Sequence, residues 1–208
     1  PSAGQVTVGG RNLLDMTSKS LVTYRRSEVG FVWQSTSRNL VPYLNVRDNI
    51  ELPMAIAGEK SKHRRDRSSY ILSELQLEDK ALRLPEQLSG GEQQRVAIGV
   101  AISNSPPLLL ADEPTGELDS QMAIDIFNLF RRINRDQGTT IVIVSHYKDI
   151  AQHVDRVVHI RDGRISSESF FESNFDRSQQ STENEYIVID EAGRLQIPTE
   201  ILNKTLIH

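Results

Sequence analysis

The chain has 208 residues, of which 38% are hydrophobic and 25% charged, and its formal net charge is −4. This length suits one sizeable core with a small appendage. The weak negative charge gives no reason to expect binding to nucleic acid or to an anionic membrane surface. Disulfides and thiolate metal sites are excluded because the sequence has no cysteine. The apolar runs are too short to span a membrane. The first residue is Pro1 rather than methionine, so we expect a fragment of a longer protein.

The N-terminal part predicts short elements. Alternation over residues 5–8, followed by Gly9-Gly10, predicts a strand whose partner we expect upstream. Residues 13–26 are polar and mixed, which indicates a short helix or a loop. Residues 28–34 predict a strand that ends in the amide side chain of Gln34.

Two helices are predicted next. Apolar residues recur at helical spacing over residues 46–54, where Pro53 could introduce a kink. Residues 68–77 predict a helix that packs on one face. The charged stretch 59–67 before it indicates a solvated helix start.

From residue 88 onward the pattern is that of an α/β protein. Residues 108–112 and 139–145 are near-continuous apolar runs, typical of parallel strands covered on both faces. Helices are predicted at 89–103, opening with a capping box, and at 121–136. The sequence therefore predicts an α/β fold with a mostly parallel sheet.

The C-terminal part changes character. Residues 148–153 predict a short helix, residues 156–160 a strand, and Asp162-Gly163 a hairpin turn. Residues 167–185, rich in Ser, Asn, Gln and Glu, indicate a linker. Residues 186–208 predict a small β-β-α module, which we expect to dimerise or dock because it cannot hold its own core.

Two acidic residues mark the carboxyl end of the strand predicted at 108–112, with Asp112 as its last residue and Glu113 directly after it. In α/β sheets ligands bind beyond the carboxyl ends of the strands. There Asp112 could hold Mg²⁺, partly through water, and Glu113 could orient or deprotonate an attacking water. The alternative is an ordinary Asp-Glu-Pro strand end.

A second candidate phosphate site lies at Ser89, Gly90 and Gly91. Glycines let the backbone approach a ligand closely, and the helix start offers free N–H groups. The alternative is an ordinary capping box formed by Ser89 with Glu92.

Three further residues have two interpretations each. His146, directly after a predicted strand, could donate a hydrogen bond to a phosphate or simply lie on the surface. Gln34 could bind Mg²⁺ or position water, or it could be a solvated loop amide. Asp119 could be part of a nucleotide site or cap the helix that follows.

These residues occur in an informative order. Leu88-Ser89-Gly90-Gly91-Glu92-Gln93-Gln94-Arg95 comes after Gln34, and Leu108 to Thr115, Leu118-Asp119 and His146 follow it. From residue 1 to about residue 166 this order resembles that of ATP-binding cassette (ABC) proteins. The resemblance implies a P-loop NTPase-like cassette that uses ATP and Mg²⁺, with a helical subdomain at about 36–103. It also implies roles for individual residues: Gln34 in the Q-loop, Ser89, Gly90, Gly91 and Glu92 in the signature loop, Asp112 as the Walker B aspartate, Glu113 as catalytic base, Asp119 in the D-loop, and His146 as switch histidine.

The sequence departs from this family in one respect. It contains no G-x-x-x-x-G-K-[ST] phosphate loop. The main cradle for the β- and γ-phosphates, one Mg²⁺ ligand and a mid-sheet strand are therefore missing, and we expect a cassette that is incomplete at its N-terminus. By itself such a chain is not expected to turn ATP over. Its signature loop could still complete a site on an intact partner.

The subgroup is indicated by two further stretches. Residues 39–42 and 49–54 look like those of the lipoprotein-releasing and macrolide-export group, whose permeases are of the FtsX type. The resemblance implies a peripheral subunit on the cytoplasmic face of the cell membrane, which works as a homodimer or with a second ATP-binding subunit. It would drive export or release of a lipophilic or peptide substrate. Residues 40–44 could fit a groove for a permease helix or belong to the helical subdomain core.

Residues 186–208 resemble an AbrB-type swapped-hairpin module, but Arg194 and Lys204 are too few basic residues for DNA binding, so dimerisation is expected.

An ABC ATPase of the DNA-repair kind would carry long coiled coils after Gln34, whereas 53 residues separate Gln34 from Leu88. A non-catalytic regulatory or interaction subunit remains the alternative function.

Overall fold

The computed structural model describes residues 4–147, 149–161, 163–171 and 183–187. Contacts divide the chain into two compact units, Pro1–Tyr147 and Lys148–His208. The first unit therefore ends before residue 166, where the change of composition predicts the end of the cassette.

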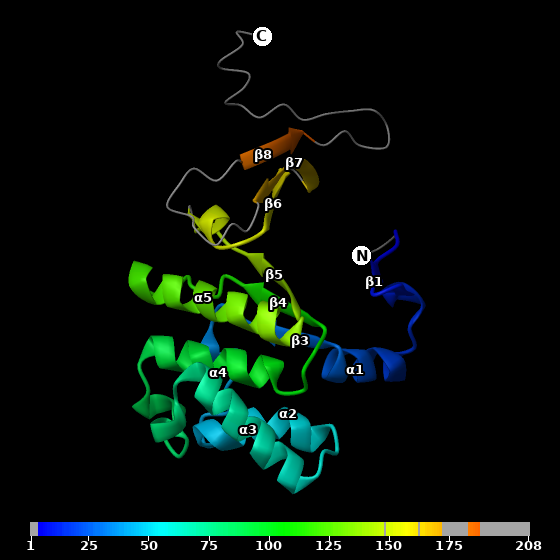
Figure 1. The fold of residues 1–208 in the computed structure, drawn as a ribbon. Helices are drawn as coiled ribbons and strands as arrows, with labels where there is room; N and C mark the ends of the chain where they lie inside the picture. Colours follow the sequence, from blue (N-terminus) through cyan, green and yellow to red (C-terminus); the bar gives the residue numbers. More distant parts are fainter. Residues whose placement is uncertain (1–3, 148, 162, 172–182, 188–208) are drawn as a thin grey trace. The chain divides into compact units, whose positions relative to one another are not determined.

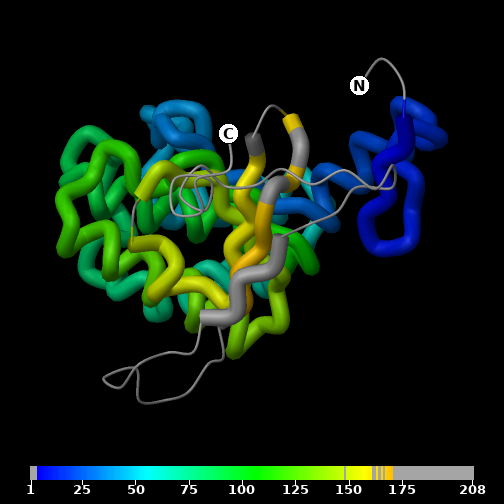
Figure 2. Tube along the Cα trace, turned by 90° about the horizontal axis from the view of Figure 1, so that it is seen from above, coloured from blue at the N-terminus to red at the C-terminus, as the bar shows by residue number. Residues whose placement is uncertain are grey.

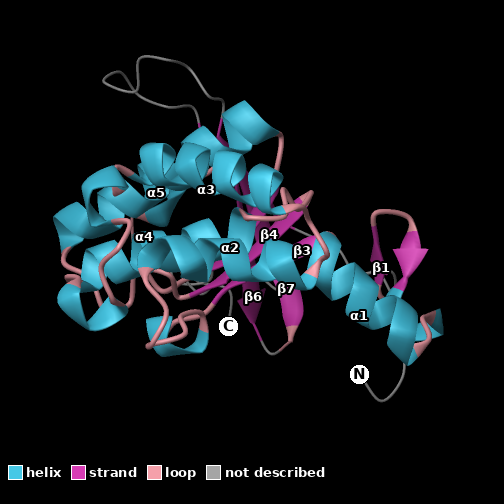
Figure 3. Cartoon of the chain, turned by 90° about the horizontal axis from the view of Figure 1, so that it is seen from below, coloured by secondary structure: helices cyan, strands magenta, loops and turns pink. Residues whose placement is uncertain are grey.

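The first unit begins with a hairpin. Strand β1 (Thr7–Val8) pairs antiparallel with β2 (Arg11–Asn12) across Gly9 and Gly10, whose φ angles are 55° and 76°. In the described residues this strand pairs with the segment just downstream of it, because the glycine turn returns the chain onto itself. A 3-10 turn (Leu13–Asp15) leads to α1 (Ser18–Ser27). The hairpin lies beyond the start of α1, apart from the main sheet of this unit (Figures 1, 2 and 3).

The main sheet has three parallel strands in the order β3 (Val29–Val32), β4 (Leu108–Asp112) and β5 (Thr140–Val144). The three strands and their parallel pairing are as predicted. Helices α4 (Gly90–Ile102) and α5 (Ser120–Gln137) make the crossovers. Because parallel crossovers are right-handed and the strand order runs in one direction, both helices lie on the same face.

The two faces of this sheet differ. On the helix-covered face, Leu109 and Ala111 are buried, as are Phe127 and Phe130 of α5. On the opposite face, Val142 and Val144 of β5 are 48% and 59% exposed. Cover on both faces, which the apolar runs predict, is thus present on one face only in the described part of the chain. The described residues also give β5 a single strand neighbour, β4.

Two helices form a further layer beyond α4. Helices α2 (Val46–Ile56) and α3 (Ser61–Leu75) pack on each other and on α4, which lies between them and the sheet (Figure 1). Their shared core is built from buried aliphatic residues: Ile50, Met54, Ile71, Leu72 and Leu75. Pro53 lies inside α2. Short 3-10 turns connect these elements: η2 (Thr36–Arg38), η3 (Glu78–Lys80) and η4 (Pro85–Gln87).

The second unit is an antiparallel sheet in the order β6 (Arg156–Arg161), β7 (Arg164–Phe171) and β8 (Glu183–Ile187), preceded by a 3-10 turn (Ile150–Gln152). Part of the predicted linker therefore forms strands. In β7 the small side chains of Ser167 and Ser169 are buried, and Glu168 pairs with Arg156 at 2.7 Å, so a polar composition is compatible with a strand here.

The predicted tail module is described only at its start. Tyr186 and Ile187 belong to β8 and pair with β7. The rest of the predicted AbrB-type module, residues 188–208, lies outside the described residues. None of the helices in the described ranges is both long enough and apolar enough to cross a membrane.

Candidate functional site

Four of the predicted site residues lie where β3, β4 and β5 end. The parallel register pairs Val32 with Ala111 and Asp112 with Val144. Gln34, Glu113 and His146 follow these strands within two residues. The three neighbouring strands therefore present an amide, two carboxylates and an imidazole at one edge of the sheet, the place where α/β proteins bind ligands. We call Gln34, Asp112, Glu113 and His146 the strand-end group.

Glu113 has an unusual backbone conformation. Its φ angle is 45°, in the left-handed region that non-glycine residues rarely adopt. Its N–H donates to the carbonyl oxygen of Val144 at 2.9 Å, which extends the β4–β5 ladder by one residue. Strained backbone of this kind persists where the surroundings hold it, often at functional sites.

The Glu113 carboxylate faces His146. Its Oε2 accepts a hydrogen bond from the backbone N–H of His146 at 3.3 Å. Its Oε1 lies 3.5 Å from Nε2 of the same histidine, but is buried and accepts no hydrogen bond. The Glu113 side chain is 18% exposed, whereas that of His146 is 98% exposed. The pair thus combines a shielded carboxylate, which has an unused acceptor, with an imidazole that is open to solvent.

Gln34 lies beside the turn that follows Glu113. A Cβ placed on Gly116 would be 3.7 Å from Nε2 of Gln34 and 3.7 Å from Cβ of Glu113. Both Gln34 and Asp112 are exposed. In the described ranges no three His, Asp or Glu side chains form a metal-binding group. The oxygen donors of Asp112 and Gln34 nevertheless suit Mg²⁺, which needs few protein ligands because it retains several waters.

The capping box predicted at Ser89 and Glu92 is confirmed. Oγ of Ser89 accepts from the N–H of Glu92 at 3.3 Å, and Oε2 of Glu92 accepts from the N–H of Ser89 at 2.9 Å. Lys80 forms an ion pair with Glu92. Hydrogen bonds from Lys80 and from the Ser89 backbone lower the pKa of Glu92. A Cβ on Gly90 would meet no atom within 4 Å, so the helix start is open to an incoming group.

Asp119 caps α5, one of the two interpretations left open by the sequence. Its Oδ1 accepts from the N–H of Met122 at 2.9 Å. The Met122 side chain lies over the signature helix, where a Cβ on Gly91 would be 2.9 Å from its sulfur. The starts of α4 and α5 therefore touch. Neither Met122 nor Lys80 stands out in the sequence, because each contact joins residues that are far apart along the chain.

The predicted residues thus form two clusters rather than one. Ser89, Gly90, Gly91 and Glu92 lie at the start of α4, and Asp119 lies near them. The strand-end group lies where the sheet ends. In the described part of the chain no hydrogen bond or ion pair joins residues 89–92 to the strand-end group.

Comparisons with known proteins identify the family. A family model described as "ABC transporter" matches residues 1–116. The macrolide export ATP-binding/permease protein MacB of Burkholderia pseudomallei is 42% identical over 165 residues, which are 79% of this chain and 25% of that protein. The chain thus spans about a quarter of the length of the MacB relatives it matches.

Shorter relatives match over most of their length. The ABC transporter ATP-binding protein YknY of Bacillus subtilis is 41% identical over 79% of this chain and 70% of its own length. Among solved structures, the dimeric post-hydrolysis state of the ATP-binding cassette MJ0796, bound to ADP and Pi, has a TM-score of 0.72. Its sequence is 36% identical to this one, and the match covers 82% of this chain and 74% of the MJ0796 chain. The chain therefore belongs to the ABC transporter family, as an ATP-binding domain related to those of the MacB proteins.

Proposed function

We propose that the full-length protein hydrolyses ATP and that the strand-end group carries the reaction. The observation that supports this most is the Glu113 carboxylate, whose buried Oε1 accepts no hydrogen bond and lies 3.5 Å from His146. Such an oxygen can accept the proton of an attacking water. His146 would donate a hydrogen bond to the phosphate that is transferred. Asp112 and Gln34 would hold Mg²⁺, which neutralises phosphate charge when bound.

The cradle for the β- and γ-phosphates does not come from this sequence. The 208 residues contain no G-x-x-x-x-G-K-[ST], so the residues present fit only part of an ATP site. The separation of the two clusters suits a dimer in which each nucleotide lies between two cassettes. The strand-end group would then act on the chain's own nucleotide, and Ser89 to Gly91 would contact the partner's. The partner would be a second copy or another ATP-binding subunit.

Replacing Glu113 by glutamine in the full-length protein tests this proposal. Glutamine has nearly the same shape but cannot accept the proton, so we expect ATP binding to persist and steady-state turnover to fall by about a hundredfold or more. Glu117→Gln is a matched control, because Glu117 is an exposed carboxylate in the turn that follows. Turnover of Glu113→Gln near the wild-type value would reject Glu113 as the base.

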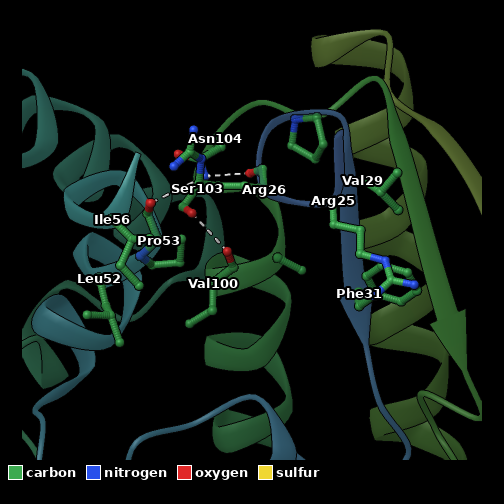
Figure 4. A pocket seen from close by; sticks show the side chains of 13 residues that line it. Arg25, Arg26, Val29, Phe31, Leu52, Pro53, Ile56, Val100, Ser103 and Asn104 are labelled. Carbon is green, nitrogen blue, oxygen red and sulfur yellow. Dashed lines mark hydrogen bonds between the residues drawn. The ribbon is translucent and has the colours of Figure 1, made fainter. Parts of the chain in front are cut away.

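We also propose that this ATPase drives a separate FtsX-type permease from the cytoplasmic face of the membrane, for export or release of a lipophilic or peptide substrate. A hollow of about 280 Å³ between β3, α2 and α4 supports a docking site. Leu52 and Ile56 of α2 face Phe31 of β3 across it (Figure 4). Arg25 and Arg26, which also line it, take part in none of the ion pairs in the described residues.

The lining of this hollow fits a short amphipathic helix. Apolar side chains of the permease would fill it, and a carboxylate would meet the two arginines. The lining of this hollow does not include residues 40–44. In that stretch Leu40 is buried, whereas Tyr43 is 79% exposed. The side chain of Asn49 holds this loop through Val41 and Leu44.

Charge reversal tests the docking site. We expect Arg25→Glu with Arg26→Glu to reduce co-purification with the permease of the same transporter while ATP binding is retained. Arg65→Glu, at an exposed position on α3, is the control. Unchanged co-purification would place the permease elsewhere. The rival function, a non-catalytic regulatory subunit, would be favoured if the complete coding sequence also lacked a phosphate loop.

A further inference from the structure

The peptide unit between Leu88 and Ser89 is held at both of its polar atoms. The side-chain Nε2 of Gln93 donates to the carbonyl oxygen of Leu88 at 3.2 Å. The N–H of Ser89 donates to Oε2 of Glu92 at 2.9 Å. Because this carbonyl and this N–H belong to one rigid plane, the two bonds together fix the orientation of the plane that leads into Ser89.

Each of the two holding side chains is itself held from outside α4. Oε1 of Gln93 accepts from the hydroxyl of Thr36, in η2, at 3.1 Å. The carboxylate of Glu92 pairs with Lys80, at the end of η3. The peptide unit between Leu88 and Ser89 is thus connected to two different turns by two short chains of polar contacts. We call the chain through Gln93 to Thr36 the Thr36 arm and the chain through Glu92 to Lys80 the Lys80 arm.

The Thr36 arm continues to the main sheet. The carbonyl oxygen of Thr36 accepts from the N–H groups of Asn39 and Leu40. The Asn39 side chain in turn bonds both sides of the β3 end: its Nδ2 donates to the carbonyl oxygen of Phe31 at 2.7 Å, and its Oδ1 accepts from the N–H of Trp33 at 2.9 Å. A continuous series of hydrogen bonds therefore runs from β3 to the signature loop.

We propose that Thr36 and Lys80 are positioning residues that set the orientation of Ser89 through Gln93 and Glu92. This rests on the proposed function, in which Ser89 contacts the partner's nucleotide. Oγ of Ser89 already accepts the N–H of Glu92, which leaves its hydroxyl proton free to donate to a phosphate oxygen. Since Thr36 follows Gln34 by two residues, the same arm ties the Q-loop segment to the signature loop.

The test compares two substitutions of one residue. Thr36→Val keeps the shape of threonine but removes the hydroxyl, and Thr36→Ser keeps the hydroxyl but removes the methyl group. We expect hydrogen exchange of the Ser89 amide, measured by NMR on the chain, to rise about fivefold in Thr36→Val, as the loss of one hydrogen bond predicts. Thr36→Ser should stay within about twofold of wild type. The opposite order would show a packing role and overturn the proposal.

The Lys80 arm is tested in the same way. Lys80→Met should speed exchange of the Ser89 amide, whereas Lys80→Arg should restore it because the guanidinium can also pair with Glu92. Lys62→Met, at an exposed position of α3, is the control. Equal effects of Lys80→Met and Lys80→Arg would overturn the role of the ion pair.

ATP kinetics of the full-length protein supply the functional readout. We expect the KM for ATP to rise about fivefold in Thr36→Val, with a smaller change in kcat, and to return in Thr36→Ser. An unchanged KM together with faster amide exchange would reject the positioning role. If the full-length protein does not hydrolyse ATP, the proposed function fails, whereas the amide exchange still decides whether the two arms hold Ser89.

Discussion

The signature loop and the strand-end group differ in how far their polar groups are satisfied. At the signature loop the peptide before Ser89 is bonded at both of its polar atoms, and the carboxylate of Glu92 has a cationic partner. In the strand-end group, Oε1 of Glu113 is buried without a hydrogen bond and the His146 side chain is almost fully exposed. Buried polar atoms are normally paired, so this unpaired carboxylate oxygen beside an exposed imidazole fits the proposed position for an attacking water.

The signature loop and the strand-end group also differ in backbone conformation. Ser89 has the extended conformation that is usual for a residue at the start of a helix. Glu113 has a φ angle of 45°. One half of the candidate site is therefore fixed by relaxed local structure, and the other half is held in a strained conformation. In the function proposed above, the first half would contact a partner's nucleotide and the second would act on the chain's own.

The largest effect on stability is expected at Gly30 of β3. This strand leads to Gln34 and packs on α4, which carries the signature loop. A Cβ on Gly30 would lie 2.4 Å from the carbonyl oxygen of Ala101 and 2.8 Å from Cδ1 of Leu109. We expect Gly30→Ala to lower the free energy of unfolding by about 3 kcal/mol, measured by urea denaturation.

The matched control is the same substitution in the open signature loop. Gly90→Ala meets no atom within 4 Å and should change the free energy of unfolding by less than about 1 kcal/mol. Equal costs at the two positions would show that the contact between β3 and α4 is not the rigid frame described above.

A smaller loss is expected when the cap of the signature helix is removed. Ser89→Ala deletes the oxygen that accepts the N–H of Glu92, and loss of an N-cap costs about 1 kcal/mol. Thermal denaturation would measure it, with Ser18→Ala at an exposed position of α1 as control. A neutral result would mean that the signature loop is not stabilised locally and would weaken the contrast with the strand-end group.

At Glu113, where the backbone is strained, we expect a substitution to raise the free energy of unfolding rather than lower it. Glu113→Gly removes the steric penalty of the left-handed conformation, and we expect the free energy of unfolding to rise by up to about 1 kcal/mol. The free energy of unfolding should not rise in Glu117→Gly, because Glu117 has no positive φ angle. Denaturant midpoints compare the two variants. A clear loss of stability in Glu113→Gly would show that the Glu113 turn is not strained.

The smallest effect concerns pH. The pKa of Glu92 is lowered from its ordinary value of 4.5, so the folded state binds this proton less readily than the unfolded state. The resulting stabilisation is complete above pH 4.5 and is lost as the pH falls through the lower folded-state value. Lys80→Met should make this loss smaller, because the hydrogen bond from Lys80 is the main cause of the shift. The same acid profile in both proteins would contradict this assignment.

The sequence predicts those parts that depend on neighbours along the chain. The apolar runs of β4 and β5, the capping box at Ser89 and the cap at Asp119 are local patterns, and all four are observed. Contacts between distant segments leave no such pattern. The bonds of Thr36 with Gln93 and of Lys80 with Glu92 join residues from different turns and therefore appear only in the structure.

Composition misleads in the second unit for a related reason. Serine and glutamate are common in linkers, but Ser167 and Ser169 lie buried in β7 because small side chains fit there. In the hairpin of β1 and β2, the two glycines indicate a turn, but they do not indicate that the strand pairs with the residues just downstream. Pairing partners depend on which edges are available, and the sequence pattern does not specify this.

The left-handed conformation of Glu113 also bears on the stability of the chain. Glycine or asparagine fits this conformation better than glutamate does, so each substitution of that kind would be favoured by stability alone. Under the proposed function, in which Glu113 is the base, the chain keeps glutamate here at a cost in stability, because neither substitute could accept the proton.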